Sequence, residues 1–489
     1  MLILHPRALF QQIVMPGFSH AAEVCLSIDL QNCFISAPEE PPPVIDMIAN
    51  TRHNNKRIPE AGMDPELAYQ LIHDDLMLDG NARLNLATFV GTWMEPQARR
   101  LMDECVDKNM IDKDEYPQTA ELEERCVRML ADLWHAPDAQ NCVGTSTTGS
   151  SEACMLGGLT LKWRWRKRRQ AAGLDAGRPN LVMGANTQIC WDKFCRYFDV
   201  EPRLVPLERD RLHLKGPEAA AHCDENTIAV VGVVGSTFDG SYEPIDEMQR
   251  CLDALQQRTG LNIPIHVDGA SGAFVAPFNS PDWPWDFRLP RVASINASGH
   301  KYGGRYPGVG WVVWRDRESL SEELIFKVNY LGGEMPTFAL NFSRPGAQVV
   351  LQYFNLLHLG RAGYQTRMAT MEANACYVAD GLAAMGPLRL VGHPKGRLPV
   401  FAVELNPSVA NYTVYHLADK LRERGWLIPA YTLPPHCEEL TVLRIVIRAD
   451  FSSDLADLLL EDFERALTHF EALDGPMPLS EPTRRFAQL

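Results

Sequence analysis

Short apolar runs recur through the middle of the chain, and each is bounded by glycine, proline or polar residues. Runs of this kind predict buried strands, here over residues 180–183, 228–234, 262–267, 292–295 and 310–314. Helical spacing over residues 245–258 separates two of these runs. Alternating strands and helices are typical of a mainly parallel sheet covered by helices, so the sequence predicts an α/β fold.

Amphipathic segments on either side of this region predict the remaining elements. Helices are expected over residues 65–78, 119–134 and 347–361. A smaller α+β unit should follow, with strands over 398–405 and 440–448 and helices over 413–424 and 453–473. We therefore expect an N-terminal extension with a helical segment (1–83), a large domain (84–371) and a small C-terminal domain (372–489).

Composition narrows the class of protein. The chain has 489 residues, 46% of them hydrophobic, and a net charge of -15. That charge argues against a general nucleic-acid binder, which needs a basic surface. No apolar run approaches the ~20 residues of a membrane helix, so no stable membrane insertion is expected. Twelve cysteines without short paired spacings predict free thiols and a cytoplasmic location.

One lysine lies next to the end of a predicted core strand, where α/β folds usually have their functional residues. Lys301 follows the strand predicted over 292–295 and precedes the one over 310–314, so it should sit on a loop between two core strands. An amine held there is partly dry, loses its charge easily and attacks carbonyl groups. A solvated surface lysine is the alternative.

Two further features of the sequence predict binding groups for a ligand that Lys301 could attack. Residues 144–158 form a Gly/Ser/Thr-rich stretch, interpreted as a loop that runs into a long helix ending near 172, with Ser150 and Ser151 at the N-cap and first turn. A helix N-terminus attracts phosphate, although a plain serine cap would look the same. Asp268 directly follows a predicted strand, at the edge where α/β sheets bind ligands.

Together these features predict a pyridoxal 5'-phosphate site. The phosphate of this cofactor needs an anion site, its aldehyde needs a lysine, and its pyridine nitrogen needs an acid to stay protonated. No metal is expected, because His73, Asp74 and Asp75 lack a second pair of ligands. A serine hydrolase and a nicotinamide dehydrogenase are disfavoured, because GxSxG and GxGxxG are absent.

A basic run with interleaved tryptophans, at residues 162–169, leaves a different class open. A non-enzymatic binding protein could use this segment as a nucleic-acid surface. Cations at the end of a helix also compensate the helix dipole, and that explanation suffices for the pattern.

Five motifs, in order along the chain, resemble the glutamate decarboxylases: GSSEACML from 149, QICW from 188, HVDGASG from 266, SGHKYG from 298 and NFSRP from 341. The resemblance runs from about residue 57 to 473. It implies the aspartate-aminotransferase type of fold (fold type I) with bound pyridoxal phosphate. The implied reaction converts L-glutamate to 4-aminobutyrate and CO2 and consumes one proton, a chemistry that often serves acid resistance. A decarboxylase or lyase acting on another amino acid is the alternative.

The resemblance also implies a role for individual residues. Lys301 would bind the cofactor aldehyde, Asp268 would pair with the ring nitrogen, and Gln188 would lie against the ring face. The remaining cofactor contacts would come from Ser150, Ser151, Thr237, Ala270, Ser298 and His300, with Ser343 reaching in from a neighbouring subunit. The substrate would be held by Thr88, Phe89, Asn109 and Asp112 at its distal carboxylate and by Arg444 at its α-carboxylate. Tyr330 would assist protonation from a mobile loop. These roles imply a homo-oligomer, with the dimer as the catalytic unit and a hexamer as a larger alternative.

Several of these positions have ordinary explanations as well, and the sequence departs from the family in two places. Thr88, Phe89 and Asn109 could serve packing or capping alone. Arg444 alternates with apolar neighbours and could be a charge on an exposed sheet face. Arg305 stands where the family has a small apolar residue, and a cation there could alter pH behaviour. The tail lacks both the terminal histidine latch of bacterial members and the calmodulin-binding segment of plant members. Activity is therefore expected to decline gradually as pH rises.

Overall fold

The computed structural model describes residues 57–329 and 335–478. Contacts group the chain into two units, one up to Asp79 and one from Gly80 onward. Within the first, α2 spans Pro65–Leu76; Asp64 caps it by accepting from the backbone N–H of Glu66 at 2.9 Å, and Pro65 occupies the first turn. The helix predicted there is confirmed, ending two residues early. Among the described residues, no helix is long and apolar enough to cross a membrane.

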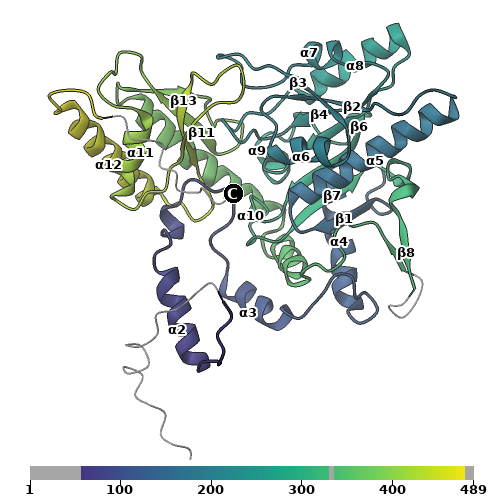
Figure 1. Ribbon diagram of the computed structural model, residues 1–489, viewed down its shortest axis with the longest axis horizontal. Coiled ribbons are helices and arrows are strands. Elements are labelled where there is room, and N and C mark those ends of the chain that lie inside the picture. The colour runs from purple at the N-terminus through teal and green to yellow at the C-terminus, as the bar shows by residue number, and fades with distance from the viewer. Residues whose placement is uncertain (1–56, 330–334, 479–489) are drawn as a thin grey trace, which may run out of the picture. The chain divides into compact units, whose positions relative to one another are not determined.

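A seven-stranded sheet forms the centre of the second unit, with strand order β1-β7-β6-β5-β4-β2-β3 (Figure 1). Its strands are β1 (Val143–Thr147), β2 (Asn180–Gly184), β3 (Glu201–Val205), β4 (Thr227–Val233), β5 (Ile265–Asp268), β6 (Val292–Ser298) and β7 (Gly310–Trp314). β7 runs antiparallel to both of its neighbours, β1 and β6, and all other strand pairs in this sheet are parallel. The predicted α/β class with a mainly parallel sheet is confirmed.

Helices cover both faces of this sheet, because its strands are apolar on both sides. In β7, Val312 packs with Leu156 of α5 (Ser150–Ala171), whereas Val313 belongs to the cluster that holds Leu130 of α4 (Pro117–Leu133). Side chains alternate between the faces of a strand, so a continuous apolar run implies burial on both. The other helices of this region are α3 (Pro96–Cys105), α6 (Ile189–Tyr197), α7 (Gly216–Ala221), α8 (Ile245–Thr259) and α9 (Ala276–Asn279).

Two expectations about this region were wrong in detail. Residues 143–147 are not part of a loop: they form β1, which pairs antiparallel with β7, and the partner strand overrides the loop-like Gly/Ser/Thr composition. The strand expected over 262–267 begins only at Ile265, after Pro264, and runs to Asp268. Proline has no N–H to donate to a ladder, which explains the late start.

A long helix leads to the C-terminal part. α10 spans Ala347–Ala383 and consists of two helical segments joined at Gly360, whose φ of 55° is not helical. The end expected at 361 coincides with this break, and the second segment was not expected. A four-stranded antiparallel sheet follows, in the order β10-β11-β13-β12. Its strands are β10 (Leu388–Val391), β11 (Val400–Leu405), β12 (Ala430–Thr432) and β13 (Thr441–Val446), accompanied by α11 (Val414–Arg422) and α12 (Ser453–Glu471). The expected small α+β arrangement is confirmed. A two-stranded ribbon pairs β8 (Phe326–Val328) with β9 (Met335–Thr337).

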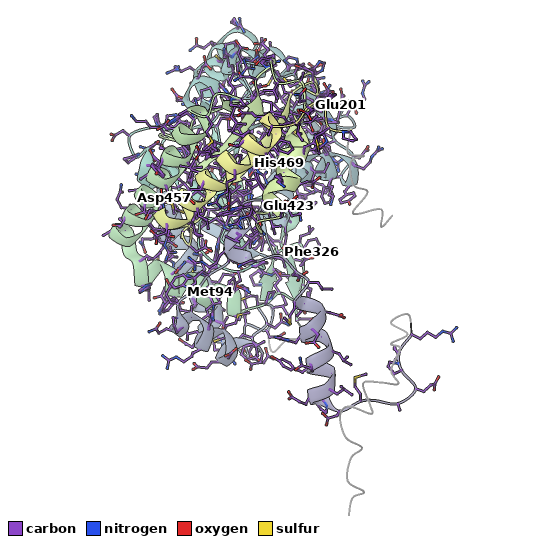
Figure 2. The ribbon with its side chains drawn as sticks, turned by 90° about the vertical axis from the view of Figure 1, so that its left-hand side faces the viewer. Met94, Glu201, Phe326, Glu423, Asp457 and His469 are labelled. Atoms are coloured by element: carbon purple, nitrogen blue, oxygen red, sulfur yellow. The ribbon has the colours of Figure 1, made fainter. Side chains whose placement is uncertain are left out.

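The last helix shows how the pattern of apolar positions set the packing. Leu459, Phe463 and Phe470 of α12 are buried, as the predicted apolar stripe requires. Asp457 and His469 lie on its exposed side, where Figure 2 labels them.

Candidate active site

A cavity of about 350 Å³ opens where the N-terminus of α5 meets the carboxyl ends of β4, β5 and β6. Nine of the ten predicted cofactor-binding residues line it: Ser150, Ser151, Gln188, Thr237, Asp268, Ala270, Ser298, His300 and Lys301. The tenth, Ser343, does not. The topology explains this convergence, because parallel strands bring their carboxyl ends to one edge of the sheet.

Lys301 occupies the turn after β6, as predicted. Its Nζ donates a hydrogen bond to Ser271 Oγ at 3.1 Å and lies 5.1 Å from the centroid of the Phe89 ring. Burial lowers the pKa of Lys301 from its usual value, and the carboxylate of Asp268 opposes this only in part. The amine is thus half-buried and easily made neutral, and a fully solvated lysine is excluded.

Asp268, at the end of β5, is 4% exposed and held as an acceptor on three sides. Trp191 Nε1 donates to Oδ2 at 2.8 Å, and the side-chain nitrogen of Asn296 and the backbone N–H of Ala270 each donate to Oδ1 at 3.1 Å. Neither Trp191 nor Asn296 was singled out from the sequence as a functional residue. Trp191 is the last residue of the QICW motif, which was the available signal.

A buried histidine lies behind this carboxylate. Asn296 turns its amide nitrogen to Asp268 and to Ser150 Oγ, at 3.1 Å each, so its oxygen must face His266 Nε2, 2.8 Å away. That oxygen can only accept, so Nε2 carries the hydrogen. Burial lowers the pKa of His266, which favours this neutral form. The ring packs so closely on α5 that a Cβ at Gly157 would lie 2.5 Å from it, which explains the glycine.

The start of α5, which also borders the cavity, suits a phosphate. Gly149, not Ser150, is the N-cap of α5, and no side chain caps it, which leaves its first N–H groups for a ligand. Ser298 Oγ and His300 Nδ1 are buried here without a hydrogen-bond partner in the described structure. Burial lowers the pKa of His300 to about 4, and the charge of Lys301 adds to the effect. These unpaired polar atoms fit the phosphate of pyridoxal phosphate, and Lys301 and Asp268 fit its aldehyde and ring nitrogen.

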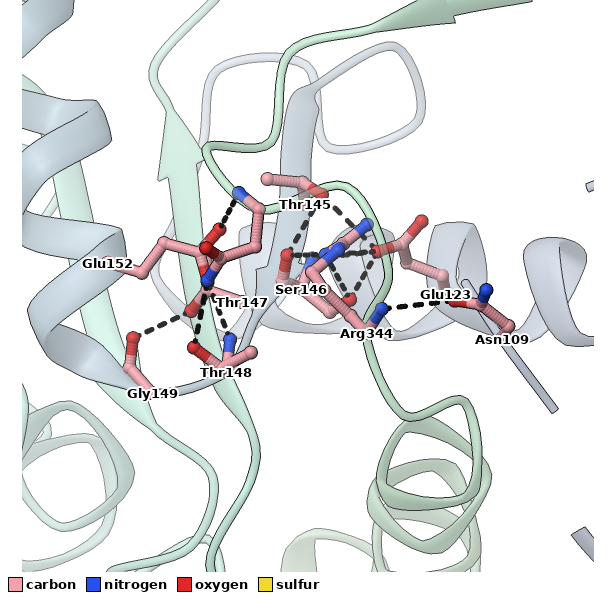
Figure 3. Close-up of polar contacts among 10 residues, drawn as sticks. Asn109, Glu123, Thr145, Ser146, Thr147, Thr148, Gly149, Glu152 and Arg344 are labelled. Atoms are coloured by element: carbon pink, nitrogen blue, oxygen red, sulfur yellow. Dashed lines mark hydrogen bonds and ion pairs between the residues drawn. The ribbon is translucent and has the colours of Figure 1, made fainter. Parts of the chain in front are cut away.

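The segment that carries Ser343 is anchored beside the start of α5 (Figure 3). Glu152 accepts from the backbone N–H of Thr148 at 2.8 Å and of Asn341 at 3.1 Å. Arg344 donates to the carbonyl of Ser146 and lies 3.7 Å from the buried carboxylate of Glu123. The segment is therefore fixed by buried polar contacts.

The predicted substrate residues fall into two groups. Asn109 donates to Ser343 Oγ at 3.3 Å, and its backbone carbonyl accepts from the N–H of Asp112 at 3.2 Å. None of these three residues lines the cavity of Lys301 in its own chain.

Phe89 and Arg444 form the other group, beside Lys301. The Arg444 guanidinium lies 4.8 Å from the Phe89 centroid and donates to the carbonyls of Thr237 at 2.9 Å and Ala87 at 2.5 Å. Its Nε is buried without a hydrogen-bond partner among the described residues. The alternative of a charge on an exposed sheet face is therefore wrong. Thr88 lies next to this pair, and its hydroxyl accepts from the backbone N–H of Val90 at 3.2 Å.

Two other expectations have different outcomes. Tyr330 lies outside the described residues. Arg305, expected as a cation near Lys301, is 1% exposed and turned away, with its guanidinium 3.6 Å from Glu95 and 3.3 Å from the sulfur of Met94. It does not line the cavity, so it ties the lysine-bearing turn to the start of α3 instead.

The described residues contain one group of potential metal ligands within 4.8 Å of one another, formed by Cys154, Cys190 and Asp268, all buried. Burial raises the pKa of the Cys154 thiol well above its usual value. A metal binds the thiolate rather than the thiol, so this group does not favour a metal.

Sequence reasoning missed a buried carboxylate near the cavity. Glu243 is 0% exposed and accepts from the backbone N–H groups of Val233 at 2.7 Å and Leu214 at 2.9 Å. It also accepts from the side-chain nitrogen of Asn186 at 2.9 Å, and Asn186 lines the cavity. No motif surrounds Glu243, because its partners come together only in the fold.

Replacing Glu243 with glutamine should flatten the pH dependence of stability. Burial raises the pKa of Glu243 from 4.5 to about 7, so the folded state binds a proton that the unfolded state releases between these pH values. The stabilisation is complete below pH 4.5 and is lost towards pH 7, by roughly 3 kcal/mol. Urea unfolding of cofactor-saturated protein at several pH values measures it. Glu225→Gln, which changes an exposed carboxylate, should keep the wild-type slope, and an unchanged slope for Glu243→Gln would contradict the assignment.

Comparisons with known proteins agree with this geometry. Residues 59–403 match the pyridoxal-dependent decarboxylase conserved domain. Glutamate decarboxylase of Aliivibrio fischeri is 54% identical over 415 residues, covering 85% of this chain and 89% of that protein. The tomato (Solanum lycopersicum) glutamate decarboxylase is 48% identical over 424 residues, covering 86% and 84%. The solved structure of Lactobacillus brevis glutamate decarboxylase superposes with a TM-score of 0.82 at 44% identity, covering 85% of this chain and 95% of that one. The chain belongs to the pyridoxal-dependent decarboxylase family and, within it, to the glutamate decarboxylases.

Proposed function

We infer that this protein decarboxylates L-glutamate to 4-aminobutyrate and CO2, using pyridoxal phosphate and consuming one proton per turnover. The observation that carries this is one cavity that holds a half-buried lysine, a fixed carboxylate and an uncapped helix N-terminus. The curated relatives named above, 48% and 54% identical, are glutamate decarboxylases.

The chain's own residues supply binding and electrostatics. When bound, pyridoxal phosphate draws electrons away from the α-carbon of an amino acid, so that the bond to the carboxylate can break. Lys301 would hold its aldehyde, since a neutral amine is the nucleophilic form. Asp268 would keep the ring nitrogen protonated, since a nearby negative charge favours the charged form of a base. Ser150, Ser151, Ser298 and His300 would hold the phosphate, while Gln188, Thr237 and Ala270 would contact the ring.

Arg444 is proposed to bind the α-carboxylate of the substrate. Its guanidinium lies over Phe89, whose ring also faces Lys301 Nζ, so a carboxylate bound there would be close to the reactive amine. Two backbone carbonyls hold the arginine, and its unpaired Nε remains available to donate. Thr88 and Phe89 would face the distal carboxylate from the same chain, and Tyr330 would assist protonation.

We propose that the catalytic unit is a dimer, or a dimer within a hexamer, and that Asn109, Asp112 and Ser343 act in the neighbouring subunit's site. None of the three lines the cavity, and unlike Phe89, which lies 5.1 Å from Lys301 Nζ, they have no described contact with the lysine, which supports this.

Mixed subunits test this arrangement. Neither Lys301→Ala alone nor the triple variant Asn109→Ala, Asp112→Ala, Ser343→Ala should be active. Random mixed dimers should regain about a quarter of wild-type turnover, because half of the dimers are mixed and each restores one intact site of two. If mixed dimers, isolated by two different affinity tags, stay inactive, the three residues act within their own chain.

Incubation with single L-amino acids tests the proposed reaction. The cofactor-saturated protein should release CO2 with L-glutamate and yield 4-aminobutyrate. Faster release with another amino acid would favour the alternative of a decarboxylase with a different substrate.

We also propose a cytoplasmic location, supported by the ten described cysteines, which are all free. A role in acid resistance is proposed because the reaction removes protons.

A further inference from the structure

A second cavity, of about 420 Å³, lies beside the C-terminal half of α5. Arg164 and Arg168 reach it from positions about 21 and 27 Å along the helix from Ser150. The arginines that line it come from α5 and from the residues flanking β6 and β7: Arg164, Arg168, Arg291 and Arg315. Two carboxylates, Asp253 and Asp316, also line it, which leaves an excess of two positive charges in a protein of net charge -15.

Two of these arginines are committed to the fold. Arg291 donates to Asp253 at 2.6 Å, to the side-chain oxygen of Asn262 at 3.1 Å and to the carbonyl of Ile263 at 3.0 Å. Arg315 donates to the carbonyls of residues 287 and 289, at 2.9 and 3.1 Å. Both guanidinium groups therefore have acceptors already and form the wall of the cavity.

The guanidinium groups of the two arginines on α5 have no acceptor among the described residues. Within the part of the chain that the structure describes, neither the side chain of Arg164 nor that of Arg168 makes a hydrogen bond or an ion pair. They stand four residues apart on one helix face, where like charges destabilise each other. Burial lowers the pKa of Arg164, and Asp316 and Glu318 act on it only from beyond ion-pair distance. An anion bound between the two groups would relieve this repulsion and give Arg164 the partner that it lacks.

The rest of the basic run faces elsewhere. Arg166 stacks on Trp163 with its guanidinium carbon 4.9 Å from the ring, and Arg169 donates to the carbonyl of Asp175 at 2.7 Å. Trp165 is 2% exposed, and its Nε1 donates to the carbonyl of Glu225 at 3.0 Å. The buried ring of Trp165 cannot stack on a base, and the ring of Trp163 is already covered by Arg166, so the run does not suit a single-stranded nucleic acid.

We propose that this cavity binds a small multivalent phosphate compound between Arg164 and Arg168. A guanidinium fork donates to two oxygens of a phosphate at once, and a dianion would balance the two unpaired charges. The volume lies in the range of small-molecule sites, so an organic phosphate fits as well as an inorganic one. This site is separate from the cofactor site and does not depend on the proposed reaction.

Calorimetric titration of cofactor-saturated protein with inorganic pyrophosphate tests the proposal. We expect one saturable site per chain, with the dissociation constant weakened about tenfold or more in Arg164→Gln and in Arg168→Gln, since each removes charge-assisted hydrogen bonds. Arg166→Gln, on the same helix but stacked on Trp163, should bind as the wild type does. Parallel titrations with inorganic phosphate and a sugar phosphate show whether the site prefers an inorganic or an organic phosphate. A titration with citrate shows whether it prefers phosphate to carboxylate groups.

The outcomes are distinguishable. Saturable binding that is equal in all variants would place pyrophosphate elsewhere and overturn the proposal, as would the absence of saturable binding. If the protein binds oligonucleotides, more tightly the longer they are, and does not bind pyrophosphate, the proposal is overturned in favour of the nucleic-acid alternative. Arg168 is exposed, so Arg168→Gln should fold even if Arg164→Gln does not. The absorbance of the bound cofactor should stay constant during titration, which excludes displacement from the cofactor site.

Discussion

Lys301→Ala should lower the turnover of L-glutamate by about 10²-fold or more, because it removes the amine that would hold the cofactor aldehyde. The variant loses the only described lysine in the cavity, and with it the amine that burial keeps easily neutralised. Decarboxylation rates measured at saturating cofactor and substrate give the effect. Lys167→Ala, which changes an exposed lysine on α5, is the matched control and should be as active as the wild type.

A covalent readout separates this role from a structural one. Borohydride reduction of the wild type should fix the cofactor on Lys301, identified by mass spectrometry of the labelled peptide, and should give no such label in Lys301→Ala. Label on a different lysine in the wild type would refute the assignment. Unfolding midpoints of the two proteins without cofactor should be close, because Lys301 makes one side-chain hydrogen bond, to Ser271.

Asp268→Asn should lower turnover by about 10²–10³-fold while leaving the fold intact. The substitution keeps the shape of the side chain but removes the charge opposite the ring nitrogen. Loss of one preorganised electrostatic group from a reaction site typically costs about 10²–10³ in turnover. The oxygen of the introduced amide can still accept from Trp191, whereas its nitrogen would oppose a donor. Turnover and cofactor affinity, measured together, test this prediction.

The control is Asp192→Asn, because Asp192 lies next to Trp191 in the sequence but does not line the cavity. Its turnover should match that of the wild type. Turnover of Asp268→Asn within a few-fold of the wild type would show that the charge of Asp268 does not support the reaction. A loss of cofactor affinity with normal turnover at saturation would assign Asp268 to binding alone.

Residues beside a strong local signal could be predicted from the sequence. Lys301 and Asp268 each follow an apolar strand, and Ser150 and Ser151 open a long helix, so topology alone brings them to one edge of the sheet. Asn296 and Glu243 escaped prediction because their importance comes from partners distant in the chain, such as Asp268 for Asn296 and Leu214 for Glu243. The helix expected over 347–361 ends where Gly360 leaves helical geometry, whereas the second helical segment of α10, up to Ala383, was not predicted.

The hydrogen bonds that connect Ser294, His266 and Asn296 to Asp268 all donate towards the carboxylate. Ser294 can only donate to Nδ1 of His266, whose Nε2 donates to Asn296, whose amide donates in turn to Asp268. Each of these groups donates towards Asp268. Trp191 is a further donor to it, and an indole N–H cannot act as an acceptor. A proton placed on Asp268 would meet donors wherever the chain already contacts it. The remaining lone pairs of this carboxylate are thus left for a donor other than the described residues that contact it, and a protonated ring nitrogen is such a donor.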